Sequence, residues 1–243
     1  MKLEHDRGGE GAALLVLLHG LGATRNVWRG IIAAGRWNGR WIAPDLRGHG
    51  ESPYGASYRL TDHAGDVAEL VDSAEVTILG HSMGGAVALE LASGRYGFVP
   101  TRVFGLGIKV AWNADELAGM AKMATLKHRF FATRNEAIER HLKIAGLSGL
   151  VPHEDGARGV TQTEEGWRMA QDPAVATVGA PPMAALMAGA RAPIHLACGE
   201  SDAMVTREQL AAFDSGARSL PGGHNAMVEH PAAVWDWIES RPA

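Results

Sequence analysis

The sequence predicts an α/β fold in which a mostly parallel, twisted sheet carries helices on both faces. The first observation is a series of near-continuous apolar runs of strand length, which are typical of strands buried on both faces. The second is that segments with helical periodicity separate these runs, which indicates helices as the crossover connections between parallel strands. The runs are Leu14 to Leu18, Trp41 to Ala43, Val76 to Leu79, Val103 to Ile108 and Ile194 to Cys198.

Capping residues place several of the other elements along the chain. Thr61 is suited to begin a helix between the second and third runs, and Thr206 with Gln209 matches a capping box after the last run. A short strand is expected over Ala217 to Leu220, followed by a final helix over about Pro231 to Glu239. These elements complete the alternation that an α/β sheet requires.

The strand pattern disappears between residues 111 and 189, where helix starts replace it. Three pairs match an N-cap followed three residues later by glutamate: Asn113 with Glu116, Thr133 with Glu136, and Thr161 with Glu164. We therefore expect three short helices with apolar stripes that must cover another part of the protein. The predicted organisation is a core of residues 1–110 and 190–243 with a small helical cap insert of residues 111–189.

Composition favours one catalytic domain that acts on small molecules. The 243 residues are 46% apolar, enough to bury a large core without metals or disulfides. The single cysteine, Cys198, excludes an internal disulfide and suits a reducing compartment. The first residues lack the apolar stretch of a signal peptide, and no run approaches the roughly 20 residues of a membrane span, so we expect a cytoplasmic protein without membrane contact. The net charge of −4 with dispersed basic residues predicts no nucleic-acid partner.

The segment Leu79 to Gly85 is the most informative motif in the chain. It follows an apolar run, leads into an Ala- and Leu-rich helical pattern, and contains the sequence Gly80-His81-Ser82-Met83-Gly84. A G-x-S-x-G turn places its serine on a sharp bend between strand and helix, where only glycine leaves enough room two residues away on either side. Ser82 would then be exposed above the sheet, and the Met83 N–H would face a developing oxyanion. This arrangement is typical of acyl-transfer enzymes.

The chain resembles the α/β-hydrolase superfamily over nearly its whole length. The resemblance implies the α/β-hydrolase fold, with a helical cap inserted after the sixth strand and a serine nucleophile, as in the esterase-like members. Because only about a dozen residues precede the first strong strand, we expect the antiparallel edge of the family's sheet to be shortened. Relatives that dehalogenate haloalkanes or open epoxides use aspartate where this chain has Ser82. The resemblance rests on Leu14 to Gly22, Pro44 to Ser52, Gly80 to Gly85, Leu196 to Asp202 and Gly222 to Asn225.

A serine hydroxyl needs a base, and the base needs an acid that holds its tautomer. His224 is the predicted base, because it lies in a Gly-Gly-His loop and the order Ser, Asp, His is that of the fold. Asp202, in the loop after Ile194 to Cys198, is the predicted acid, and its rival is Asp115, which also fits the first turn of a helix.

The remaining histidines near the motifs, His19, His49 and His81, are interpreted as structural hydrogen-bonding residues, and His230 as a capping or surface residue. By the same resemblance, the backbone N–H of Leu21 is the second oxyanion-hole donor beside Met83. Asp45 is expected to fix loops through hydrogen bonds. We expect neither a cofactor nor a metal.

The leading functional hypothesis is a carboxylesterase that cleaves a small to medium, largely apolar ester, lactone or thioester through a Ser82 acyl-enzyme. The insert is expected to cover the catalytic cleft and to supply a soft apolar pocket. One alternative is a carbon–carbon bond hydrolase of the dienoate or diketone type, for which Arg129, Arg134, Arg140 or Arg168 would hold a substrate carboxylate. A second alternative is a non-catalytic ligand-binding module on a hydrolase fold. The candidate pocket residues are Met120, Phe130, Trp167 and Met187.

Overall fold

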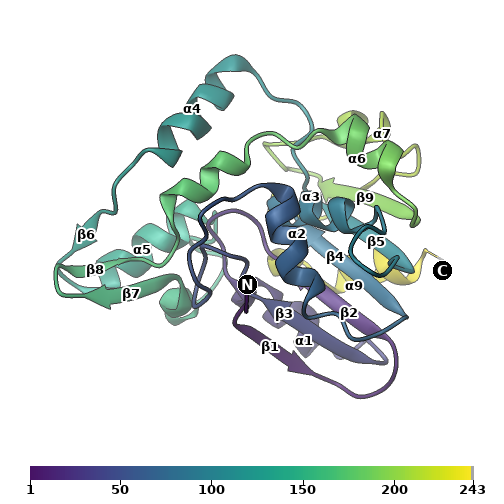
Figure 1. Ribbon diagram of the computed structural model, residues 1–243, viewed down its shortest axis with the longest axis horizontal. Coiled ribbons are helices and arrows are strands. Elements are labelled where there is room, and N and C mark those ends of the chain that lie inside the picture. Colours follow the sequence, from purple (N-terminus) through teal and green to yellow (C-terminus); the bar gives the residue numbers. More distant parts are fainter. Residues whose placement is uncertain (242–243) are drawn as a thin grey trace.

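The computed structural model describes residues 1–241, within which seven strands form the central sheet (Figure 1). The strand order is β1-β3-β2-β4-β5-β9-β10, and every neighbouring pair is parallel except β1 with β3. This confirms the predicted mostly parallel sheet. The strands are β1 His5–Gly8, β2 Leu14–Leu18, β3 Arg40–Pro44, β4 Val76–His81, β5 Arg102–Leu106, β9 Ile194–Gly199 and β10 Arg218–Leu220.

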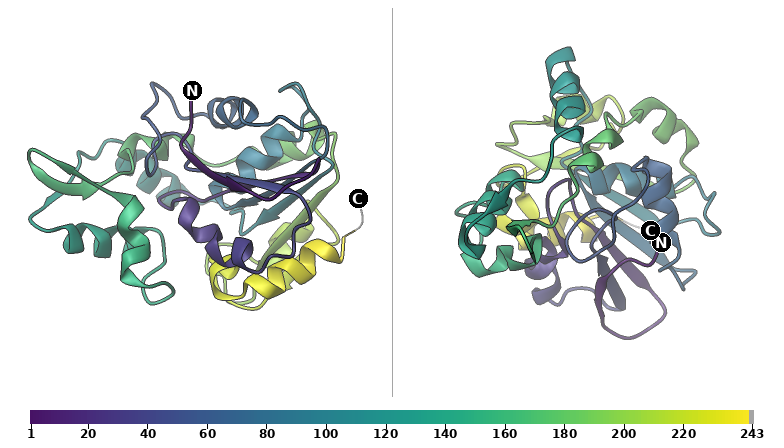
Figure 2. Two further views of the ribbon diagram at one scale, coloured as in Figure 1. Left: turned by 90° about the horizontal axis from the view of Figure 1, so that it is seen from below. Right: turned by 60° about the vertical axis from the view of Figure 1, so that its left-hand side comes forward.

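Helices cover both faces of the sheet, because the strands are apolar on both sides. In β2, Leu14, Val16 and Leu18 join one buried cluster, whereas Leu15 and Leu17 join the other. The first cluster lies beneath α2 (Leu60–Ala68), α3 (Met83–Leu91), α6 (Met183–Gly189) and α7 (Arg207–Ala211). The second lies beneath α1 (Arg29–Ala33), α8 (Ala226–Glu229) and α9 (Pro231–Glu239). The 3-10 helix η1 (Arg25–Trp28), which directly precedes α1, also contributes to it. Figure 2 shows α1 and α9 on the opposite face from α2.

The sequence placed α7, from its capping box, and α9 correctly, but the predicted start of α2 was wrong. That helix begins at Leu60, where the Asp62 carboxylate accepts a hydrogen bond from the Arg59 backbone N–H at 3.0 Å. Thr61 therefore lies inside the first turn and does not cap it. None of the helices within residues 1–241 is both long enough and apolar enough to cross a membrane.

From Ala114 to Met169, the insert of residues 111–189 extends to one side of the sheet in Figure 1, whereas its last helix, α6, packs over the sheet beside α3. Two of its predicted helix starts are confirmed: Asn113 caps α4 (Ala114–Ala124), and Thr133 caps α5 (Arg134–Ile144). The prediction of a third helix at Thr161 was wrong, since the chain there forms a β-hairpin. Its strands, β7 (Val160–Thr163) and β8 (Gly166–Met169), join β6 (Phe130–Phe131) in a small antiparallel sheet.

The hairpin turn explains why the Thr-x-x-Glu pattern was misleading. Thr163 Oγ1 accepts from the Glu165 N–H at 3.2 Å and donates to the Gly166 carbonyl at 3.0 Å, and Gly166 has a φ of +122°. These residues thus build a turn rather than a helix start. Two 3-10 helices, η2 (His153–Gly159) and η3 (Pro173–Val178), complete the insert together with α6. The division into core and insert remains a proposal.

The insert follows β5, which is the fifth strand within residues 1–241 and not the sixth. The difference arises at the amino-terminal edge, where β1 alone pairs antiparallel with β3, as the short segment before Leu14 led us to expect. The predicted strand Val103 to Ile108 was also too long. It ends at Leu106 because Gly107 has a φ of +65°, which breaks the extended conformation.

Candidate active site

Ser82 lies at the carboxyl end of β4, on the turn that leads into α3. It is the one non-glycine residue within 1–241 with positive φ (51°), and its N–H donates to the Leu106 carbonyl at 2.8 Å. A Cβ atom on Gly80 would lie 2.3 Å from the Gly84 carbonyl oxygen, and one on Gly84 would lie 2.3 Å from the Leu18 carbonyl oxygen. The turn therefore requires both glycines. Its strained backbone lifts Ser82 out of the sheet, as the motif predicted.

Asp202 and His224 meet beside this turn from the loops that follow β9 and β10. His224 Nδ1 lies 2.9 Å from Asp202 Oδ2, and the Asp202 side chain is completely buried. Its other oxygen accepts from the Met204 N–H at 2.8 Å. Since an ionised carboxylate only accepts hydrogen bonds, Nδ1 of the neutral imidazole carries the proton and Nε2 keeps its lone pair. The pair thus presents a base to the cavity that contains Ser82.

Within residues 1–241 the rival acid, Asp115, makes neither a hydrogen bond nor an ion pair with this imidazole. Asp115 is exposed in the first turn of α4, at the helix position where carboxylates are common for dipole reasons. Gly107 gives the Asp202–His224 pair its space, because a Cβ atom there would lie 3.3 Å from the His224 ring and 3.4 Å from Asp202 Oδ2. The geometry therefore joins His224 to Asp202. Both catalytic roles remain predictions.

The loop that carries Leu21 is fixed by two buried histidines. His19 Nδ1 donates to the Gly20 carbonyl at 2.8 Å, while its Nε2 accepts from the Leu46 N–H at 2.9 Å. His49 Nε2 accepts from the Gly22 N–H at 3.1 Å. Burial lowers the pKa of His19 to about 3 and the pKa of His49 well below its usual value, so both rings are neutral at neutral pH. Their contacts agree with the structural role predicted for them.

Gly20 allows this loop to approach the serine closely. A Cβ atom at Gly20 would lie 3.1 Å from Ser82 Cβ and 2.9 Å from His81 Nδ1. Leu21 and Met83 both line the cavity in front of Ser82, with Met83 at the first position of α3. Their N–H groups are thus suited to serve as the two oxyanion-hole donors, a role that stays a prediction.

Asp45 fixes the neighbouring loop in the way expected of it. Its completely buried carboxylate accepts from the Arg25 N–H at 2.8 Å and from the Glu51 N–H at 3.0 Å, and it also pairs with the Arg25 guanidinium. This network connects the segment after β2 with the segment after β3.

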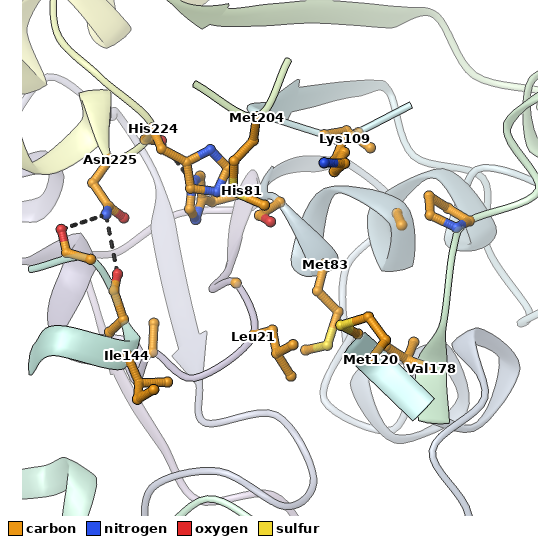
Figure 3. Close-up of a pocket in the computed structure, with 18 of the residues that line it drawn as sticks. Leu21, His81, Met83, Lys109, Met120, Ile144, Val178, Met204, His224 and Asn225 are labelled. Atoms are coloured by element: carbon orange, nitrogen blue, oxygen red, sulfur yellow. Dashed lines mark hydrogen bonds between the residues drawn. The ribbon is translucent and has the colours of Figure 1, made fainter. Parts of the chain in front are cut away.

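A cavity of about 870 Å³ opens above Ser82 between the core and the insert (Figure 3). Met120 lines it, as predicted. Most of the other lining side chains are apolar, and among them Leu21 and Met123 were also expected at the pocket. Others were not predicted, because they come from loops and element ends far apart in the sequence. These include Ile108, Ile144, Leu150, Val178 and Met204.

Three of the four predicted pocket residues do not line this cavity. Phe130 and Trp167 lie on β6 and β8, where Trp167 packs under the Arg134 guanidinium. Met187 lies on α6 and packs against the buried cluster beneath α3. Phe130 is exposed, and Trp167 and Met187 are partly buried against the two clusters, so apolar content alone did not indicate which side chains line the cavity. These pocket assignments were therefore wrong.

Charged groups are few on the cavity wall. Lys109, which follows β5, pairs with Glu116 of α4 and lies 5.1 Å from the centre of the Trp112 ring. The arginines proposed as carboxylate anchors, Arg129, Arg134, Arg140 and Arg168, do not line the cavity. Within residues 1–241 no group of three or more histidine, cysteine, aspartate or glutamate side chains is arranged to hold a metal ion.

Comparisons with known proteins agree with this architecture. The model of the alpha/beta hydrolase family matches residues 15–237. A magnesium-chelatase 30 kDa subunit from Rhodobacter capsulatus is 33% identical, with 96% of this chain and 89% of that protein covered. A lipase from Mycobacterium tuberculosis is 35% identical over 36% of this chain and 34% of its own length. The chain spans only part of the length of other relatives that it matches. It covers 26% of an uncharacterised Mycobacterium tuberculosis protein and 33% of a Pseudomonas putida dihydrolipoyllysine-residue acetyltransferase component.

Solved structures show the same fold over 97–98% of the chain. A marine microorganism esterase superimposes with a TM-score of 0.75 at 19% identity, covering 98% of both chains. The thioesterase domain from the curacin biosynthetic pathway superimposes with a TM-score of 0.76 at 20% identity, covering 97% of this chain and 94% of that one. At these identities the likeness concerns the fold alone.

Proposed function

The chain belongs to the α/β-hydrolase family, and we propose that it is a serine hydrolase that cleaves a largely apolar carboxylic ester through a Ser82 acyl-enzyme. One observation carries the proposal. Ser82, on a strained turn, shares a cavity with His224, whose Nδ1 is hydrogen-bonded to the buried Asp202 carboxylate. A nucleophile, a base and an acid that orients the base are the parts that acyl transfer requires.

The first half of the proposed reaction forms the acyl-enzyme. Ser82 Oγ attacks the ester carbonyl carbon while its proton moves to His224 Nε2. The carbonyl oxygen becomes an oxyanion that accepts hydrogen bonds from the N–H groups of Leu21 and Met83, and Asp202 stabilises the imidazolium. When the tetrahedral intermediate collapses, the carbon–oxygen bond to the alcohol breaks and the alcohol oxygen takes the proton from Nε2.

The second half returns the enzyme to its starting state. Water gives one proton to His224 Nε2 as its oxygen attacks the acyl carbon, and the same two N–H groups bind the second oxyanion. Collapse then breaks the bond to Ser82 Oγ, which recovers its proton from the imidazolium. The products are a carboxylic acid and an alcohol. A thioester or a lactone would follow the same steps.

The cavity wall supports an apolar acyl or alcohol group on the substrate. Aliphatic and thioether side chains dominate it, and methionines such as Met120 and Met123 adapt to different shapes. A carbon–carbon hydrolase acting on a dienoate is not favoured, since none of the four arginines expected to anchor its carboxylate reaches this wall.

A small-molecule substrate and a cytoplasmic location are part of the same proposal.

Cys198, the single cysteine, is buried in β9, and burial raises the pKa of its thiol to about 11. Such a thiol is protonated at neutral pH and offers no competing nucleophile.

A substrate panel tests the proposed function. Aryl esters of increasing acyl length, lactones and dienoate acids are supplied to the wild type, to Ser82→Ala and to Ser219→Ala, a control at an exposed position on β10. We expect neutral esters to be hydrolysed by the wild type and the control, and turnover to be lost in Ser82→Ala. A dienoate cleaved in preference to every ester would overturn the ester assignment. Ligand binding without turnover of any substrate would favour a non-catalytic module.

A further inference from the structure

His81 is a buried histidine that the proposed reaction does not use. It is the last residue of β4 and is 3% exposed, directly before Ser82. Its Nε2 lies 2.9 Å from the backbone carbonyl oxygen of His224, and the two ring centres are 4.6 Å apart. Because a carbonyl oxygen only accepts, Nε2 of His81 carries the proton and donates it. In Figure 3 the two neighbouring rings overlap in the view.

The ring of His81 is neutral and fixed in one tautomer. Burial, together with the neighbouring His224, lowers the pKa of His81 well below its usual value. Its Nδ1 is therefore unprotonated, and within residues 1–241 that nitrogen has no hydrogen-bond partner. The same nitrogen faces the loop before Leu21, where a Cβ atom on Gly20 would approach it to 2.9 Å. His81 thus touches both the loop of the base and the loop of the oxyanion hole.

The loop that carries His224 is held by separate contacts on either side of that residue. It begins with two glycines, of which Gly222 has a φ of +99°, and the Gly222 carbonyl accepts from the Ser201 N–H at 3.0 Å and from the Ser201 hydroxyl at 2.9 Å. Glu229 accepts from the Gly223 N–H at 2.9 Å on one side, and Asn225 Nδ2 donates to the carbonyls of Ala145 and Gly146 on the other. Asp202 orients the imidazole but does not hold the backbone from which it projects.

We propose that His81 is a positioning residue for the base: its Nε2–H holds the His224 carbonyl and thereby keeps the His224 imidazole in reach of Ser82. This inference rests on the proposed function. The anchor comes from the residue adjacent to the nucleophile, so base and nucleophile are linked through one hydrogen bond and one peptide bond. A displacement of about 1 Å between reacting groups can cost about 100-fold in rate.

A purely structural role predicts a different result from a positioning role. The unpartnered Nδ1 of a buried imidazole lowers stability, so leucine at this position removes a cost as well as a hydrogen bond. We therefore expect His81→Leu to leave the melting temperature unchanged or raised while the rate falls. If His81 only supported the fold, rate and melting temperature would fall together.

The test compares His81→Leu with His81→Gln, whose side-chain amide places a donor near the position of Nε2. The measurements are kcat and KM for an aryl ester, the rate of Ser82 phosphonylation by a small reagent, and the melting temperature. We expect kcat and the phosphonylation rate of His81→Leu to fall about 10- to 100-fold with KM nearly unchanged, and His81→Gln to recover most of the loss. If His81→Leu does not fold, His81→Asn, whose amide is too short to reach the carbonyl, takes its place.

Wild-type values of kcat and of the phosphonylation rate in His81→Leu would overturn the proposal. So would a folded His81→Gln that loses as much of these rates as His81→Leu does. Failure of the proposed function gives a distinct result, namely that wild-type Ser82 is not labelled at all. In that case crystal structures of the wild type and His81→Leu still decide the inference, since it requires the His224 ring to be displaced or disordered in the variant and ordered in the wild type.

Discussion

His63 gives the chain a pH-dependent weakness that a single substitution should remove. It lies on the buried face of α2, is fully inaccessible to solvent, and neither ring nitrogen has a hydrogen-bond partner within residues 1–241. Burial lowers the pKa of its imidazole to about 3. The ring can therefore stay in the folded protein only in its neutral form, and protonation favours unfolding.

The magnitude follows from the difference between the folded and unfolded pKa values. The unfolded value is about 6.5, so protonation of His63 has no effect on the free energy of unfolding above that pH. As the pH falls from 6.5 toward the folded value of about 3, the free energy of unfolding decreases progressively. Each unit of that interval corresponds to about 1.4 kcal/mol in the free energy of unfolding. Between pH 7.5 and pH 5.0 the loss is about 2 kcal/mol, or roughly 4–8 °C in melting temperature for a domain of this size.

The assay is thermal unfolding of the wild type and His63→Leu at both pH values. The other buried histidines are present in both proteins, so their contributions cancel in the difference. We expect the stability of His63→Leu relative to the wild type to rise by about 2 kcal/mol on going from pH 7.5 to pH 5.0. His153→Leu, at an exposed position of the insert, is the control. A His63→Leu difference that is the same at both pH values would refute the reasoning.

Further predictions concern the active site. Asp202→Asn should stay folded but lose as much as about 10⁴-fold in turnover through the wrong imidazole tautomer, whereas Asp115→Asn should be nearly normal; steady-state kinetics that show the reverse would move the acid to α4. Gly20→Ala should lower turnover about 10²- to 10³-fold without comparable unfolding, because its Cβ would lie 3.1 Å from Ser82 Cβ and push the Leu21 N–H away; unchanged kcat would argue against this oxyanion loop. Acyl-chain profiles should rise roughly three- to fourfold in kcat/KM per carbon until the cavity is full, and Met120→Ala should shift the optimum to longer chains whereas Phe130→Ala should not.

The central sheet could be predicted from the sequence because its signals are local. A parallel strand that is buried on both faces has a short unbroken apolar sequence, such as Leu14 to Leu18. The nucleophile turn was equally predictable from the sequence, since the close approach of Gly84 to the Leu18 carbonyl leaves no alternative to glycine. His224 and Asp202 followed from their places after consecutive strands.

The insert and the cavity wall were harder because their determinants are not local. The Thr161 pattern fits a helix cap and a hairpin turn equally well. In the structure, strand β8 of the hairpin also pairs with Phe130 and Phe131 of β6, which lie far from it in the sequence. Trp167 and Met187 are apolar residues of the insert, but their burial elsewhere is decided by packing across the fold. His81 was recognised as structural, yet its contact with the His224 carbonyl depends on a residue 143 positions away.

Covalent labelling of Ser82 tests the central claim most directly. The protein is treated with a small organophosphonate, and the adduct is located by intact mass and peptide mapping, because only a serine activated by a neighbouring base reacts readily with such a reagent. We predict one adduct per chain on the peptide that contains Ser82, slowed strongly in His224→Ala and absent in Ser82→Ala. An adduct that persists in Ser82→Ala, or a wild-type protein that stays unlabelled while it hydrolyses esters, would contradict the account.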